Sequence, residues 1–187
     1  QHNGGDMAIG AYGIINRVLT LFVMIIMGLT MGMQPIIGYN YGSNQMKRVK
    51  QTLKIGIATG VGINTIGFFV CVLFPHAISS IFTNEESLIE IAASGLRISI
   101  LIFPLVGSQI VISNFFQSIR KAKVSVFLSL SRQLLYLLPC LLLFPHFLGT
   151  NGVWWSMVVS DFLAFVTAAL ILDSHFKKIN KRNSALV

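Results

Sequence analysis

Five long apolar runs, separated by short polar segments, make up most of the chain. They cover residues 8–37, 55–74, 90–119, 124–144 and 152–172. The second, fourth and fifth runs have the length of about 20 residues that a helix needs to cross the hydrocarbon core of a bilayer. The first run is longer than one crossing requires, which predicts a helix that tilts, kinks or projects beyond the bilayer.

These runs are expected to form helices rather than strands. Apolar and polar residues do not alternate along them, and only helices or closed barrels satisfy backbone polar groups in lipid. Pro75 and Pro145 follow the second and fourth runs in matching Leu-Phe-Pro-His sequences, which predicts that both helices end there. Gly28 and Gly32, followed by Pro35, permit a bend near the end of the first helix. The pattern therefore predicts an all-α, polytopic transmembrane helix bundle.

Composition supports a membrane protein. Only 11% of the residues are charged and 54% are hydrophobic, whereas about a quarter of the residues in a soluble domain are charged. The formal net charge is +8, but nucleic-acid binding needs a basic face on a soluble domain. Here the charge lies at the ends of the apolar runs, where contact with anionic lipid headgroups explains it. Membrane lipid is therefore an expected partner, and nucleic acid is not.

Basic residues mark one side of the membrane. Eleven of the 14 Lys and Arg residues form three clusters, which are Lys47, Arg48, Lys50 and Lys54; Arg120, Lys121 and Lys123; and Lys177, Lys178, Lys181 and Arg182. The connections on the opposite side, 75–86 and 145–151, contain no Lys or Arg. Short loops rich in Lys and Arg face the cytoplasm. The C-terminus is therefore predicted to be cytoplasmic, with residues 173–187 forming a basic, solvated tail.

The start of the chain suggests that part of the protein lies upstream. Five crossings place the two ends on opposite sides of the membrane. The first six residues are polar and do not begin with Met, and they lack the features of a signal peptide. We interpret the chain as a piece of a longer polypeptide that has a sixth span before Gln1.

Polar residues recur along one face of three predicted helices. Residues three, four, seven or eleven positions apart share a helical face. The three seams consist of Asn16, Thr20, Met27, Thr30 and Gln34 on the first helix; Gln109, Ser113 and Gln117, with Asn114 beside them, on the third; and Ser125, Ser129, Arg132 and Tyr136 on the fourth. Such residues either hydrogen-bond between packed helices or line a water-filled cavity that binds a solute. Three seams in one short chain favour the cavity.

Four ionisable residues lie within the predicted spans: Arg17, Arg97, Arg132 and Asp161. A charge at the centre of a span costs about 2.5–3.5 kcal/mol on insertion scales and usually has a partner. At a rise of about 1.5 Å per residue, Arg132 lies about 12 Å from one edge of the hydrocarbon and Asp161 about 14 Å from the other. We expect an ion pair at this shared depth, either as a fixed bridge or as part of a proton or cation relay. Arg17 and Arg97 lie nearer the surface and are expected to extend toward it, with an anion-attracting or gating role as the alternative.

The remaining candidate residues predict helix packing rather than a disulfide, a metal site or catalysis. Gly56, Gly60 and Gly67 share one face of the second helix, which predicts close helix packing. Cys71 and Cys140 lie within apolar runs, so neither a disulfide nor a metal site is expected. The sequence offers no Ser-His-Asp, Cys-His or His-Glu arrangement, and each His lies at a predicted loop or terminus. An enzyme is therefore not expected.

Five motifs extend over nearly the whole chain. They are residues 4–17 (GGDMAIGAYGIINR), residues 34–42 (QPIIGYNYG) with a predicted Gly-Tyr-Asn-Tyr-Gly turn, Phe115-Phe116-Gln117 before Lys121, Ser131-Arg132-Gln133, and Gly152-Val153-Trp154-Trp155 leading to Ser160-Asp161. Together they resemble the second half of a multidrug and toxic compound extrusion (MATE) transporter. The resemblance is strongest to the MepA-like and DinF-like branches of that family.

The resemblance implies twelve helices in two six-helix lobes, with this chain supplying all but the first helix of the second lobe. The missing N-terminal lobe of the same polypeptide would then be its partner. It also implies a protein of the bacterial inner membrane that exports small amphipathic, often cationic, compounds by alternating access. Export would be in exchange for Na+ or H+, with no cofactor besides that coupling ion.

One departure from the family pattern affects ion coupling. Some branches place a coupling carboxylate in the helix that corresponds to the third span, whereas this sequence has Arg97 and no Asp or Glu deep in that segment. Coupling is then expected to rest on the missing lobe or on Asp161. A lipid-linked saccharide flippase of the same superfamily, which would favour a more cationic cavity, and a non-transporting membrane assembly subunit are the alternatives.

Overall fold

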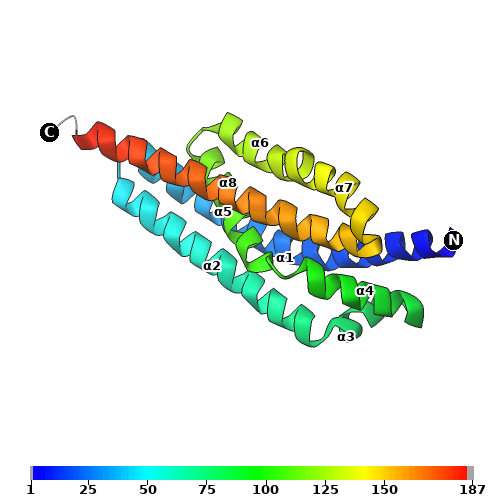
Figure 1. Cartoon of the computed structure of the whole chain (residues 1–187). Coiled ribbons are helices and arrows are strands. Elements are labelled where there is room, and N and C mark those ends of the chain that lie inside the picture. The colour runs from blue at the N-terminus through cyan, green and yellow to red at the C-terminus, as the bar shows by residue number, and fades with distance from the viewer. Residues whose placement is uncertain (1, 185–187) are drawn as a thin grey trace.

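A computed structural model describes residues 2–184, and these residues form helices joined by short turns, with no strand among them. The elements are α1 (His2–Gly42), α2 (Met46–Leu73), α3 (Pro75–Ser80), α4 (Glu86–Ser99), α5 (Phe103–Ser118), α6 (Ala122–Leu130), the π-helical segment η1 (Ser131–Leu137), α7 (Leu138–Leu148) and α8 (Thr150–Ser184). Figure 1 shows an elongated bundle in which α2 and the α6–η1–α7 segment lie along opposite edges.

Apolar helices long enough to cross a bilayer confirm the predicted fold class. Four stretches meet the requirement separately, and the bent pair of α4 and α5 makes a fifth span when counted as one. The four are Met7–Gly42, Met46–Leu73, Ala122–Leu148 and Asn151–Ile179. Large apolar side chains cover the outside of the bundle, including Ile9 at 72% exposure and Phe147 at 78%. An outer surface of this kind is suited to lipid rather than water.

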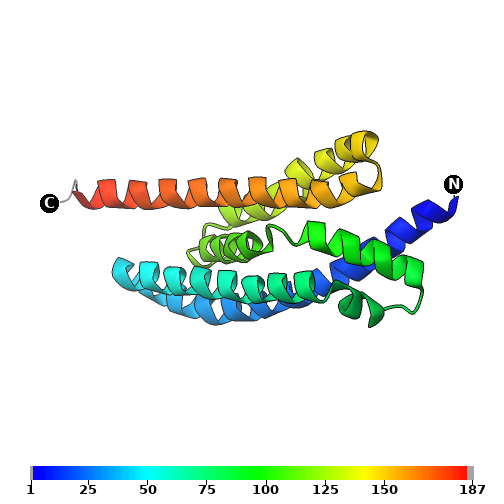
Figure 2. The same ribbon diagram turned by 60° about the horizontal axis from the view of Figure 1, so that its bottom comes forward.

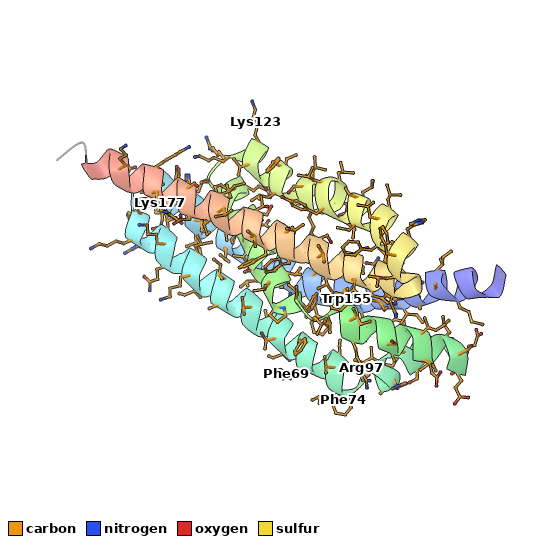
Figure 3. All side chains as sticks on the ribbon, viewed as in Figure 1. Phe69, Phe74, Arg97, Lys123, Trp155 and Lys177 are labelled. Carbon is orange, nitrogen blue, oxygen red and sulfur yellow. The ribbon has the colours of Figure 1, made fainter. Side chains whose placement is uncertain are left out.

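The basic clusters lie toward one end of the bundle. The N-terminal end of α2, the α5–α6 turn and the C-terminal end of α8 are all found there, while the start of α1 lies at the opposite end (Figure 1). Lys123 and Lys177 lie toward this basic end, and Phe74 and Arg97 lie toward the other (Figure 3). The two ends of the chain therefore lie at opposite ends of the molecule, as an odd number of crossings predicts.

The third predicted span, 90–119, is broken rather than continuous. Helix α4 ends at Ser99, α5 begins at Phe103, and their axes differ by 60°. Pro104 lies in the first turn of α5. It lacks the backbone N–H of a continuous helix, and its ring would clash with the carbonyl of residue 100. The chain therefore leaves the helix before this proline and resumes it with the proline in a permitted position.

Asn64 of α2 stabilises this break from across the bundle. Its Nδ2 donates a buried hydrogen bond of 2.8 Å to the backbone carbonyl of Phe103. We expect Asn64→Ala to lower the free energy of unfolding by about 0.5–1.5 kcal/mol, because it removes the buried hydrogen bond that joins α2 to the start of α5. The measurement is the thermal unfolding midpoint of the purified protein in detergent. Thr65→Ala is the matched control, because the Thr65 hydroxyl bonds only to Val61 of its own helix. Equal shifts for both variants would contradict the role given to Asn64.

Pro145 does not end its helix, contrary to the sequence expectation, whereas Pro75 marks a boundary. Helix α2 ends at Leu73 and Pro75 opens the short α3. Helix α7, in contrast, continues through Pro145 to Leu148, and the chain turns at Gly149, whose φ is +56°. A proline removes only one hydrogen bond when it lies in the last turn of a helix, so the glycine with positive φ sets the boundary instead.

The first helix is longer than predicted and is not interrupted at its glycines or its proline. Helix α1 remains helical past Gly28, Gly32 and Pro35 and ends at Gly42. The predicted turn over residues 38–42 is therefore wrong, and the turn follows at Asn44, which has a φ of 57°. Figure 2 shows the C-terminal half of α1 alongside α2, while its N-terminal part diverges past α4. The extra length carries α1 beyond the rest of the bundle.

The described part of the tail predicted over residues 173–187 is helical, and most of its residues are exposed. Helix α8 continues to Ser184, and His175 is buried at 7% exposure. Its ring packs against Phe116 and Phe176, with centroids 5.4 and 5.7 Å apart. The expectation that each His lies at a loop or terminus is thus wrong for His175. Burial of an aromatic face supplies the free energy that keeps this polar stretch helical.

Small residues allow α2 to pack closely against α1 and α5, as predicted for Gly56, Gly60 and Gly67. A Cβ added at Gly60 would lie 3.3 Å from the Gly107 carbonyl oxygen, and one added at Gly67 would lie 2.8 Å from the Phe22 ring. One added at Gly56 would collide with Met33. Gly56 and Gly67 therefore make room for side chains of α1, and Gly60 lets the backbones of α2 and α5 approach each other.

Candidate functional site

A polar cavity of about 220 Å³ lies among α1, the α4–α5 break, η1 and α8. Its polar lining residues are Tyr12, Asn16, Thr20, Ser99, Arg132, Gln133, Ser160 and Asp161. Leu19, Val23, Phe103, Leu137 and Met157 complete the wall. The cavity is therefore bordered by four segments that are far apart in the sequence.

The predicted ion pair between Arg132 and Asp161 is present at this cavity. Arg132 Nε donates to Asp161 Oδ1 at 2.6 Å, and the two side chains are 34% and 14% exposed. The Arg132 terminal nitrogens make no hydrogen bond to another residue in the range 2–184. The pair thus joins η1 to α8 and leaves hydrogen-bond donors for a further ligand.

The π-helical segment η1 positions Arg132 at the cavity. π-Helical turns are rare and frequently occur at functional sites. Here seven residues, Ser131–Leu137, adopt this geometry between the α-helical segments α6 and α7. Arg132 and Gln133 lie in the first turn of this segment, and both line the cavity. No periodic signal in the sequence indicates this π-helical geometry.

The first polar seam divides between the cavity and helix packing. Asn16 and Thr20 line the cavity, and the Thr20 hydroxyl donates to the Asn16 carbonyl at 2.7 Å. Met27 is exposed at 49%, and the buried Thr30 hydroxyl bonds to the Met27 carbonyl. Gln34 reaches Asn114 of α5 at 3.4 Å. Asn16 and Thr20 are therefore the residues of this seam that line the polar cavity.

The seams on the third and fourth predicted helices mainly form hydrogen bonds to neighbouring helices. Ser113 Oγ lies 3.4 Å from Ser125 Oγ and 3.2 Å from Ser129 Oγ. Tyr136 shares a 2.7 Å hydrogen bond with Thr167 of α8. These contacts follow the packing alternative, in which polar side chains bond between helices. Gln109 is buried at 4% exposure, Gln117 is exposed, and neither lines the cavity.

Arg17 and Arg97 lie outside the polar cavity. Arg17 is exposed and lines an adjoining space of about 360 Å³, which shares Asn16 and Thr20 with the polar cavity. Arg97 is exposed in the last turn of α4. In Figure 3 it lies toward the end of the molecule opposite Lys177. The structure therefore does not bring the four ionisable residues of the predicted spans together.

Four polar residues at the cavity were missed by the candidate set from the sequence: Tyr12, Ser99, Gln133 and Ser160. Tyr12 lies four residues before Asn16, so extending the first seam by one turn would have found it. Ser160 adjoins Asp161. Ser99 lines the cavity because the chain breaks there, and its buried Oγ has no hydrogen-bond partner in the described part of the chain.

Comparison with known proteins identifies the family. The sequence profile of the MatE family matches residues 2–142. The chain belongs to the MatE family. Among curated relatives of this MatE chain, the multidrug export protein MepA of Staphylococcus haemolyticus is 25% identical over 98% of the chain. MepA of Staphylococcus aureus strain bovine RF122 is 27% identical over 90%.

Solved structures agree with this assignment. The MATE multidrug transporter DinF-BH superposes with a TM-score of 0.81 at 35% identity over 92% of the chain. An outward-facing MATE transporter of the MOP superfamily gives a TM-score of 0.89 at 21% identity over 95%. This MatE chain spans 40% and 37% of the two MepA proteins and 39% of DinF-BH. The chain therefore matches one part of each of these longer proteins.

Proposed function

We propose that this chain forms most of one lobe of a cation-coupled antiporter that exports amphipathic, often cationic, compounds by alternating access. The observation that carries the proposal is the Arg132–Asp161 pair at a polar cavity among apolar spans. Ionisable residues within membrane spans are rare and typically mark ion or substrate pathways. The relatives named for multidrug export support the substrate class.

Asp161 is the proposed coupling group in this lobe. A carboxylate that is paired with Arg132 in one state and binds a proton or Na+ in another would link ion movement to conformation. Such a switch needs two arrangements that differ by only a few kcal/mol. Outward-facing and inward-facing structures are both known for proteins with this fold, which supports alternating access.

The flippase alternative receives less support from the cavity. A lipid-linked saccharide carries anionic phosphate, which would favour net positive charge in the binding space. Here the Arg132 charge is balanced by Asp161, while Arg17 and Arg97 lie outside the polar cavity. The proposed substrate is therefore a cation or a neutral amphipathic compound.

We also propose that the C-terminus is cytoplasmic and that the protein resides in the bacterial inner membrane. The gathering of three basic clusters toward one end of the bundle supports this orientation (Figure 1), because short cytoplasmic loops are rich in Lys and Arg.

The experiment that tests the function uses the full-length polypeptide that contains this chain. Cells that express it are expected to accumulate less of a fluorescent amphipathic cation than cells with an empty vector. Collapsing the Na+ gradient or the proton gradient separately then identifies the coupling ion, because only the coupled gradient is needed for export. Unchanged accumulation, with the protein present in the membrane, would refute the proposed export activity.

A further inference from the structure

A second cavity, of about 320 Å³, lies between the α5–α6 turn and the C-terminal part of α8. It shares no lining residue with the Arg132–Asp161 cavity. Lys121 comes from the turn, whereas Ser174, His175 and Lys178 come from α8. Its volume falls at the lower end of the range of about 300–1,000 Å³ that is usual for small-ligand sites. We call it the Lys121–Lys178 pocket.

The positive charge in this pocket is not neutralised by the protein. No Asp or Glu belongs to the lining, and neither Lys121 nor Lys178 forms an ion pair within residues 2–184. The nearest acidic residue along α8, Asp173, pairs instead with Lys177 at 2.6 Å. Two lysines of the pocket therefore lack an anion in the described part of the chain.

His175 holds Lys121 without cancelling its charge. Lys121 Nζ lies 3.0 Å from His175 Nδ1. An ammonium group only donates hydrogen bonds, so Nδ1 accepts and the imidazole is neutral, with its proton on Nε2. The ring is fixed by edge contacts to Phe115 and Phe116, at centroid distances of 6.0 and 5.4 Å. A neutral, immobile partner thus orients a full positive charge at the pocket.

The pocket is amphipathic along the helix axis. Leu170, exposed at 63%, and Val124 line its other part. Leu170 precedes Lys178 by eight residues on α8, which corresponds to about 12 Å along the axis. Basic groups therefore lie toward the end of the bundle and apolar side chains lie toward its middle. A phospholipid has the same arrangement, with the phosphate at the membrane surface and the acyl chains below it.

We propose that the Lys121–Lys178 pocket binds a phosphate-bearing anion, supplied by the headgroup of an anionic phospholipid. The inference rests on the proposed orientation, because anionic lipids attract basic segments at the cytoplasmic surface. Basic pockets between transmembrane helices are suited to such headgroups. Free inorganic phosphate has the same chemistry as the headgroup, but it would make no use of the exposed apolar part of the pocket.

The test measures lipid binding to the full-length protein in detergent by native mass spectrometry. Phosphatidylglycerol is the probe, and phosphatidylcholine is the lipid without net charge. We expect K121Q/K178Q to weaken phosphatidylglycerol binding roughly tenfold, since each basic residue near an anionic surface contributes substantially to binding. K123Q/K181Q removes the same charge outside the pocket, leaves the Asp173–Lys177 pair intact and is expected to bind like the wild type. Lys123 lies toward the basic end of the bundle (Figure 3).

The possible outcomes distinguish a specific lipid-binding site from general attraction of lipid to a charged surface. Equal weakening by the two double variants, or none by K121Q/K178Q, would overturn the proposal. If millimolar inorganic phosphate displaces phosphatidylglycerol from the wild type but not from K121Q/K178Q, the result would support the site and identify its ligand as the free anion. Lys178→Gln alone provides a second variant, because Lys178 is exposed and forms no ion pair in the described part of the chain. It is expected to give a smaller loss in the same direction.

Discussion

Replacing Asp161 with Asn is expected to reduce export of an amphipathic cation by the full-length transporter at least roughly tenfold, which corresponds to about 1.4 kcal/mol in the limiting barrier. An amide does not take up the proton that a carboxylate does, and it lacks the charge that attracts a cation. It also leaves the positive charge of Arg132 without the carboxylate that neutralises it. Export is measured as loss of fluorescence from preloaded cells, with expression matched by immunoblot.

Two further variants separate a relay from a fixed bridge. R132Q/D161N removes both charges and retains hydrogen-bonding groups, so a purely structural bridge predicts that export recovers relative to D161N. A relay predicts that the double variant exports as poorly as D161N. Asp173→Asn is the matched control on the same helix, because its pair with Lys177 is largely exposed and exposed pairs contribute little. Full export by D161N would refute the relay.

A second large effect is expected at Gly107, where α5 meets α2. A Cβ at this position would collide with the backbone carbonyl of Gly60. Because backbone atoms do not move aside as a flexible side chain does, Gly107→Ala is expected to lower the free energy of unfolding by about 1–3 kcal/mol. The thermal unfolding midpoint of the purified full-length protein in detergent measures the change.

Gly62 provides the control for this substitution within the same pair of helices. A Cβ at Gly62 meets nothing within 4 Å. Gly62→Ala is therefore expected to leave stability unchanged or to raise it by up to about 1 kcal/mol, because Ala favours helix over Gly. A midpoint for Gly107→Ala as high as that for Gly62→Ala would show that α2 and α5 do not pack as closely as described.

The Arg132–Asp161 pair shows how much of the site is predictable. Two charges at one depth, in consecutive apolar spans joined by a short turn, have few alternative partners in a low-dielectric environment. Counting residues from each end of the spans was therefore enough to predict the pair. The seams show the limit of the same method, because Ser113 and Tyr136 satisfy the helical spacing yet bond to neighbouring helices. Helical periodicity shows which residues share one face of a helix, but it does not show which neighbouring segment packs against that face.

The sequence by itself determined the membrane class, the approximate positions of the five apolar spans and the clustering of the basic residues. These properties depend on local hydrophobicity and charge, which each segment carries independently of its neighbours. Only the tertiary structure decided where the third span breaks, how Ser99 comes to line a cavity with Asn16, and why His175 is buried beside Lys121. Those outcomes depend on contacts between residues that are far apart in the chain, so no local pattern contains them.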